Sequence, residues 1–188
     1  FDDVSPLTVG VEEEVFLLDP ETLDLTPRAA ELIGEGDERI KLELPAAQGE
    51  LVTPPYASVP DVVADLGAAR TALAERLGDE ACAAALAVHP FAPAEGPLNP
   101  GERYSALQAE YGPVARRQLV CALQVHVAVG GADRTLAVYD ALRSHLPDIA
   151  ALASAAPYHD GRDTGLASIR PSLAQLLPRQ GVPPAFGS

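Results

Sequence analysis

Carboxylates inside apolar, strand-like segments are the residues of this sequence with the clearest chemical potential. Glu12, Glu13 and Glu14 lie in the apolar run 7–18, and Glu50 lies in a second such run. Because alternate side chains of a strand share a face, Glu12 and Glu14 should point together and Glu13 away from them. Clustered carboxylates repel one another unless a cation lies between them, and Mg2+ prefers such oxygens. The pattern predicts a magnesium–nucleotide site on a sheet or, alternatively, an edge-strand charge run that prevents aggregation.

A further apolar run, residues 116–129, contains Gln124 and His126. These two residues share one strand face because they are two positions apart. A polar group buried in such a strand costs about 1–3 kcal/mol when it is left unpaired. A single strand histidine is more often a hydrogen-bonded core residue than a ligand. Beside acids at positions 12, 14, 43 and 50, however, both residues become candidate metal ligands.

The loop 158–170 combines glycines and hydroxyl groups with Arg162 and Arg170. Arginine binds carboxylates or phosphates through a planar, two-pronged set of donors. The alternative is a polar turn with surface ion pairs, and the local sequence does not decide between the two. The sequence has no Walker-type phosphate loop and no dinucleotide-binding glycine fingerprint. A nucleotide would therefore be held through metal and arginine contacts.

Composition narrows the possible partners. The chain has 188 residues, 47% hydrophobic and 21% charged, which is typical of one globular domain spanning 1–188. The net charge is −14, and residues 1–50 hold 14 of the 27 acids. An acidic surface disfavours nucleic acids and anionic membranes. The sequence shows no apolar run of the ~18 residues a membrane span needs and no signal peptide, so we expect a cytoplasmic protein. Cys82 and Cys121 are expected to be buried, reduced thiols.

Strand and helix patterns alternate irregularly, which indicates an α+β fold rather than a regular βαβ series. For the longest helix, Ser58 is the expected N-cap and Gly78 the expected end. Strands are predicted at 7–18, 39–44, 50–53 and 86–91, with a buried strand within 116–129. Helices are predicted at 29–33, 58–77, 80–85, 102–111, 133–145, 147–155 and 172–177.

Several motifs, in order along almost the whole chain, resemble glutamate–cysteine ligase family 2. Its members are bacterial carboxylate–amine ligases related to glutamine synthetase. The motifs are Gly10-Val11-Glu12-Glu13-Glu14, Gln48-x-Glu50-Leu51-x-Thr53-Pro54, His89-Pro90-Phe91-Ala92, Arg103-Tyr104, Arg116-Arg117-Gln118-Leu119-Val120-Cys121 and Gly161-Arg162-Asp163-Thr164-Gly165-x-Ala167-Ser168-x-Arg170. The resemblance covers about the N-terminal half of the family's usual length, so the chain is expected to be half of a catalytic domain.

The resemblance implies a partial glutamine synthetase-like fold, in which helices pack on one face of an antiparallel sheet. It also implies binding of ATP and Mg2+, with Mn2+ as a possible substitute. The γ-carboxylate of glutamate would be phosphorylated and then attacked by an amine such as cysteine. Arg170 would bind the substrate carboxylate or phosphate, with Arg162, Thr164 and Ser168 at the nucleotide. The implied metal ligands are Glu12, Glu14, Glu43, Glu50, Gln124 and His126.

One position departs from the family pattern. The family's strand typically reads Gly-Leu-His-Val-His-Val-Gly, whereas this chain has Gln124 at the first histidine position. Glutamine offers a carbonyl oxygen but no ring nitrogen. The alternative function is therefore a non-catalytic, ligase-like binding protein or an inactive fragment that acts through a partner. A half-domain should also leave an unpaired strand edge or an apolar face, so we expect a homo-oligomer or a complementing C-terminal half.

Overall fold

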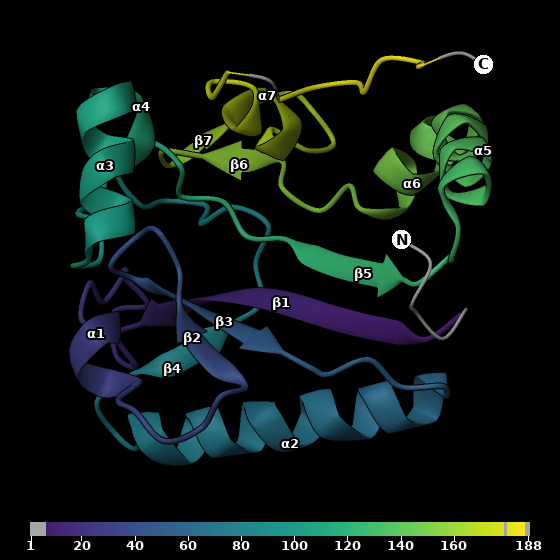
Figure 1. Ribbon diagram of the computed structural model, residues 1–188. Coiled ribbons are helices and arrows are strands. Elements are labelled where there is room, and N and C mark those ends of the chain that lie inside the picture. The colour runs from purple at the N-terminus through teal and green to yellow at the C-terminus, as the bar shows by residue number, and fades with distance from the viewer. Residues whose placement is uncertain (1–6, 179, 187–188) are drawn as a thin grey trace.

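The computed structural model describes residues 7–178 and 180–186, and its centre is an antiparallel sheet around one long strand, β1 (Figure 1). On one side β1 pairs with β3, which pairs with β2. On its other side β1 pairs first with β5 and then, nearer its end, with β4. β6 and β7 form a separate hairpin. The strands are β1 (Val9–Leu18), β2 (Ile40–Leu42), β3 (Gln48–Val52), β4 (Cys82–Ala84), β5 (Leu123–Val127), β6 (Tyr158–His159) and β7 (Arg162–Asp163).

Helices complete the α+β fold that the sequence predicts. α1 and α2 cover one face of the sheet, whereas α3, α4, α7 and the β6–β7 hairpin lie on the other side of it (Figure 1). The helices are α1 (Ala29–Leu32), α2 (Val59–Leu77), α3 (Glu102–Tyr111), α4 (Pro113–Arg116), α5 (Ala132–Leu142), the 3-10 helix η1 (Arg143–His145), α6 (Leu146–Leu152) and α7 (Arg170–Ala174). None of the described helices is long and apolar enough to cross a membrane.

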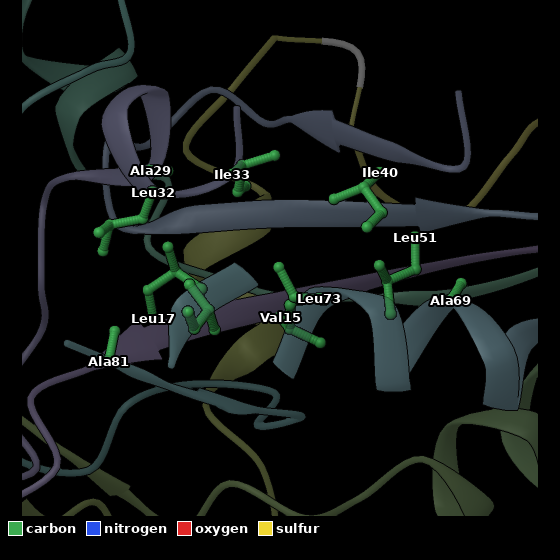
Figure 2. Close-up of a cluster of buried hydrophobic side chains, with 11 residues drawn as sticks. Val15, Leu17, Ala29, Leu32, Ile33, Ile40, Leu51, Ala69, Leu73 and Ala81 are labelled. Carbon is green, nitrogen blue, oxygen red and sulfur yellow. The ribbon is translucent and has the colours of Figure 1, made fainter. Parts of the chain in front are cut away.

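The alternation of β1 divides its side chains between two cores. Val15 and Leu17 face α2 in the larger core, shown in Figure 2, whereas Phe16 and Leu18 belong to a second core on the opposite face. Glu13 shares the α2 face and is 5% exposed. Arg70 of α2 neutralises it, with its Nε 2.7 Å from Glu13 Oε2. The opposite face of β1 therefore begins with acids and ends in a buried apolar cluster.

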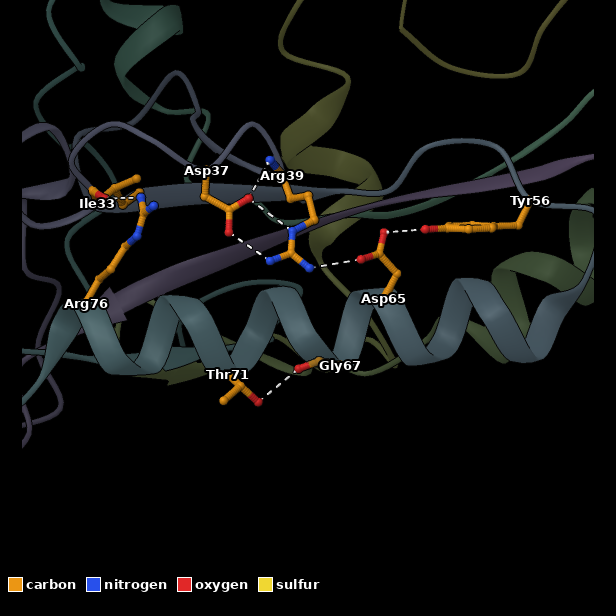
Figure 3. A network of polar contacts seen from close by, with 8 residues as sticks. All are labelled: Ile33, Asp37, Arg39, Tyr56, Asp65, Gly67, Thr71 and Arg76. Carbon is orange, nitrogen blue, oxygen red and sulfur yellow. Dashed lines mark hydrogen bonds and ion pairs between the residues drawn. The ribbon is translucent and has the colours of Figure 1, made fainter.

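A polar network joins α2 to the segment that leads into β2 (Figure 3). Arg39 lies between Asp37 and Asp65, with ion-pair distances of 2.8 and 2.9 Å. Its hydrogen bonds lower the pKa of Asp37 to about 2. Tyr56 donates to Asp65, and Arg76 donates to the carbonyl of Ile33. These contacts fix the start of the β2–β3 hairpin, which carries two of the acids discussed below.

Two predicted elements near residue 85 are wrong. The alanine-rich segment 80–85, expected to be helical, contains β4, because pairing of residues 82–84 with the end of β1 outweighs the helix propensity of alanine. The segment 86–91, expected to be a strand, makes only an isolated bridge between Val88 and Val120. The final helix begins at Arg170, two residues before its predicted start at Ser172.

The strand predicted to be buried within 116–129 is short and exposed. Arg116 ends α4, and β5 covers only Leu123–Val127. Leu123 and Val125 are 63% and 61% exposed. They are the register partners of Glu13 and Val11, so they share the sheet face that α2 covers elsewhere. The described residues do not cover this part of the face, which explains why apolar residues stay exposed.

The other boundaries agree closely with the sequence patterns. α2 begins directly after Ser58 and ends at Gly78, although the Ser58 side chain makes no capping hydrogen bond. α3 matches its predicted range of 102–111. Both cysteines are free thiols, but only Cys121 is fully buried, since Cys82 is half-buried.

Candidate active site

Three carboxylates converge on the sheet face opposite α2. Glu14 of β1 and Glu50 of β3 are directly paired in the register, so their side chains leave the same face. Glu43, which follows β2, joins them, and one oxygen of each acid lies within 4.8 Å of the others. All three side chains are half-buried. The predicted separation of Glu13 from its neighbours is confirmed, because Glu13 instead faces α2 and Arg70.

Side chains from beyond the sheet hold the β2–β3 connection in place. Asn99 donates its amide hydrogens to the carbonyl oxygens of Glu43 and Pro45, at 2.7 and 3.0 Å. The hydroxyl of Tyr104, on α3, donates to the carbonyl of Leu42 at 2.7 Å. Glu43 thus lies at a fixed position although it follows the last residue of a three-residue strand. Its backbone is fixed by residues about 60 positions later in the chain.

A second polar group lies towards the start of β1. Gln124 is the register partner of Glu12, and His126 is the partner of Gly10, so both side chains share the face of the acids as predicted. His126 Nε2 is 3.4 Å from Glu12 Oε2, and both side chains reach solvent. They line a hollow of about 310 Å3, together with Gly10 and Thr53. Glu12, Gln124 and His126 are thus adjacent to the three-acid cluster but not part of it.

Arg170 approaches the cluster through the segment 120–122. This segment runs between β4 and β5 alongside β1, where the carbonyl of Ala122 accepts from the N–H of Glu14. The N–H of Ala122 donates to the carboxylate Oε2 of Glu14 at 2.7 Å. The Nε of Arg170 donates to the carbonyl of Cys121, also at 2.7 Å. Arg170 is therefore held beside Glu14 by a main-chain contact.

Repulsion between the acids is visible in their electrostatics. Burial, followed by the nearby Glu43 carboxylate, raises the pKa of Glu14 to about 7. The positive charge of Arg170 acts in the opposite direction. Burial also raises the pKa of Glu50, and Glu43 and Glu12 add to this effect. The acids thus have more negative charge than the surrounding protein compensates, which is the condition under which a cation binds.

The other predicted residues of the loop 158–170 lie in the hairpin that precedes α7. Arg162 is exposed and belongs to β7. The hydroxyl of Thr164 donates to the carbonyl of Pro157 at 2.7 Å, so it is used within the loop. Ser168 is half-buried and forms an isolated bridge with Ala156. Among the described residues of this loop, only Arg170 affects the pKa of a cluster acid.

The titration of Glu14 gives a testable pH dependence of stability. The folded chain keeps the Glu14 proton up to about pH 7, whereas the unfolded chain loses it near pH 4.5. The folded state binds more protons between these values, so the Glu14 contribution to the free energy of unfolding falls as pH rises through the window. We expect a loss of about 2 kcal/mol. Urea unfolding of the parent and Glu14→Gln at pH 5 and 7.5 measures it.

The control for that experiment is Glu95→Gln, which removes an acid outside the cluster. Glu14→Gln should be selectively more stable than the parent at pH 7.5, and added Mn2+ should remove the advantage by stabilising only the parent. Equal pH dependence in the parent and Glu14→Gln would contradict this assignment.

Comparisons with known proteins agree with this arrangement. Residues 8–188 match the model of glutamate–cysteine ligase family 2. Over 192 residues the chain is 42% identical to a Rubrobacter xylanophilus protein named "Putative glutamate--cysteine ligase 2-3", covering 97% of this chain and 52% of that protein. A Ruegeria pomeroyi protein named "Putative glutamate--cysteine ligase 2" is 33% identical, covering 96% of this chain and 49% of its own. The chain thus spans about half the length of these relatives.

A solved structure shows the same fold. A glutamate–cysteine ligase from Francisella tularensis, in complex with AMP, superposes with a TM-score of 0.66 at 12% identity. The superposition covers 90% of this chain and 43% of that one. The fold is therefore that of a glutamate–cysteine ligase-like enzyme. The chain belongs to glutamate–cysteine ligase family 2.

Sequence reasoning missed the residues that position the acids. Asn99 and Tyr104 act through hydrogen bonds to main-chain carbonyls, and such contacts leave no pattern in the sequence. Lys41 has one signal that reasoning overlooked: it is two residues before Glu43, so an extended chain directs both to one face. It is the register partner of Glu50, and its charge opposes the rise in the pKa of Glu50.

Proposed function

We propose that this chain is the N-terminal half of an ATP-dependent carboxylate–amine ligase that joins the γ-carboxylate of glutamate to an amine such as cysteine. The reaction would proceed through an acyl phosphate on glutamate. The observation that carries the proposal is the three-acid cluster of Glu14, Glu43 and Glu50, in a chain that belongs to this ligase family. The cytoplasm, where ATP is available, is the proposed location.

The donor set fits Mg2+. Half-buried carboxylate oxygens within 4.8 Å of one another, with raised pKa values for Glu14 and Glu50, supply charge and hard oxygen ligands. We assign Glu14, Glu43 and Glu50 to one ion. Glu12, with Gln124 and His126, is assigned to an adjacent ion, for which Mn2+ can substitute because imidazole suits it. When bound, the ions neutralise charge on the phosphates of ATP.

The protein's own residues supply orientation and charge. Arg170 has its Nε held by Cys121, so the other guanidinium donors are directed by a fixed backbone. In this proposal they bind the carboxylate that receives the phosphoryl group and stabilise the oxygens of the acyl phosphate. Arg162, Thr164 and Ser168 of the preceding loop are proposed to contact the nucleotide. The Thr164 hydroxyl must then accept from its ligand, because it already donates to Pro157.

Association belongs to the same proposal. The exposed apolar side chains of β5 and the chain's span of about half its relatives' length both suit a covering partner. We propose that a second copy or a complementing C-terminal half covers this face. Leu123→Ser together with Val125→Thr should weaken association, as measured by sedimentation velocity.

The assay of the function is formation of ADP from ATP in the presence of Mg2+, glutamate and cysteine, compared with reactions lacking one substrate. It is run on the 188-residue chain and on any longer chain that the gene encodes. ADP formation that requires both substrates supports the ligase. Tight nucleotide binding without turnover in every form would favour the non-catalytic alternative instead.

Gln124→His tests the adjacent metal position. A histidine here would face the same side as Glu12 and His126 and add a ring nitrogen to the ligand set. We expect Mn2+ binding to tighten about tenfold, because imidazole binds Mn2+ better than an amide oxygen does. Binding should also weaken below about pH 6.5, where imidazole becomes protonated. Mn2+ titration followed by electron paramagnetic resonance measures both effects, and unchanged affinity would place residue 124 outside the site.

A further inference from the structure

Gln48 is a buried amide that the proposed chemistry does not use. It is the first residue of β3, is 0% exposed, and is the register partner of Phe16 in the second core. Its Nε2 donates to the carbonyl of Val120 at 3.0 Å and to Cys121 Sγ at 3.3 Å. No hydrogen-bond donor among the described residues reaches its Oε1. An unpartnered buried amide oxygen is unfavourable, so an apolar residue of similar shape would suit mere packing better.

The two residues that Gln48 holds lie at the start of an irregular segment. Residues 121 and 122 belong to no strand, although they lie between the bridge at Val120 and the first residue of β5. In a regular antiparallel ladder, the N–H of Ala122 would donate to the main-chain carbonyl of Glu14. It donates instead to the Glu14 carboxylate. A side chain of the proposed metal site therefore replaces a main-chain acceptor of the sheet.

The same short segment also holds the proposed substrate-binding arginine, since Arg170 donates to the carbonyl of Cys121. Three consecutive residues thus bind, in order, Gln48, Arg170 and Glu14. The N–H of Cys121 donates to Ala87, which fixes the segment from its other side. Gln48 is the side chain that ties this backbone to β3, the strand that carries Glu50.

We infer that Gln48 is a positioning residue that holds the backbone of residues 120–122, and through it both the Glu14 carboxylate and the Arg170 guanidinium. The inference rests on the proposed function for the meaning of those two groups. The hydrogen-bond chain itself does not depend on a ligand.

Gln48→Met tests the inference, because methionine keeps the length and volume but removes both amide hydrogen bonds. The first readout is hydrogen exchange of the Ala122 amide in the 188-residue chain, followed by NMR. The reference is the Leu17 amide, which donates to Ala47 within the same sheet. We expect exchange at Ala122 to accelerate at least tenfold more than exchange at Leu17. A role limited to overall stability would accelerate both amides equally and would overturn the inference.

Gln118→Met is the matched control, since Gln118 is also buried and also donates to a main-chain carbonyl, that of Val114. It should leave the ratio of the two exchange rates unchanged. Gln48→Asn, whose amide is one methylene too short to reach Val120, is the second variant if Gln48→Met does not fold. It should shift the ratio in the same direction.

The second readout is Mn2+ affinity, which should fall about tenfold in Gln48→Met and stay at the parent value in Gln118→Met. Selective exchange at Ala122 with unchanged Mn2+ affinity would overturn the link to Glu14. If the parent itself binds no Mn2+, the proposed metal site fails, and the exchange ratio alone still decides whether Gln48 holds the segment.

Discussion

Glu50→Gln should reduce ligase turnover by about a thousandfold, because removing one charged ligand costs several kcal/mol of transition-state stabilisation. Glu50 is the register partner of Glu14 and shares its cation site with Glu43, so the amide would leave a site with one charge fewer at the same place. The fold should survive, since Glu50 forms no ion pair among the described residues and burial raises its pKa. Steady-state ADP formation and Mn2+ affinity measure the effect.

Glu95→Gln is the matched control for this loss. Glu95 is an acid outside the cluster, paired with Arg117 at 2.9 Å, and both side chains are exposed. Its replacement should change turnover less than twofold. If Glu50→Gln retained turnover within a factor of ten of the parent, the cluster would not be the metal site of the reaction.

Arg170→Lys should lower turnover by about a hundredfold or more, although lysine keeps the positive charge. A planar guanidinium can donate to Cys121 through Nε while its other nitrogens bind a carboxylate or phosphate, and an ammonium lacks this fixed, forked geometry. Because the arginine is assigned to the transferring group, the loss should fall on kcat more than on the KM for ATP.

Arg143→Lys is the control, because Arg143 also donates to a main-chain carbonyl, that of Pro183, at 2.7 Å. It lies on η1 and is not assigned to the site, so its replacement should leave kcat unchanged. A purely structural role for Arg170 would instead lower thermal stability while leaving kcat for the folded fraction intact.

The sequence predicts the acid cluster well because strand alternation is a strict geometric rule. Once residues 9–18 form a strand, Glu12 and Glu14 must leave one face and Glu13 the other, and the short hairpin places Glu50 beside them. The position of Glu43 depends on hydrogen bonds from Asn99, which no local pattern indicates.

Errors in the predicted elements have the same origin in long-range contacts. The segment around Cys82 favours helix by composition but pairs with the end of β1, a partner more than 60 residues earlier in the chain. Burial of β5 was inferred from its apolar residues. Burial depends on a second surface, and the described residues provide none over Val125. Local patterns therefore predict which side chains share a face better than what covers that face.

The most direct test of the central proposal follows an oxygen atom. Glutamate labelled with 18O in its γ-carboxylate is incubated with ATP, Mg2+ and cysteine, and the phosphate products are examined by mass spectrometry. Through an acyl phosphate, attack by the amine expels the phosphoryl group with one carboxylate oxygen, so each amide formed should yield one inorganic phosphate carrying one 18O. Amide formation with the label in AMP, or with unlabelled phosphate, would contradict the proposal.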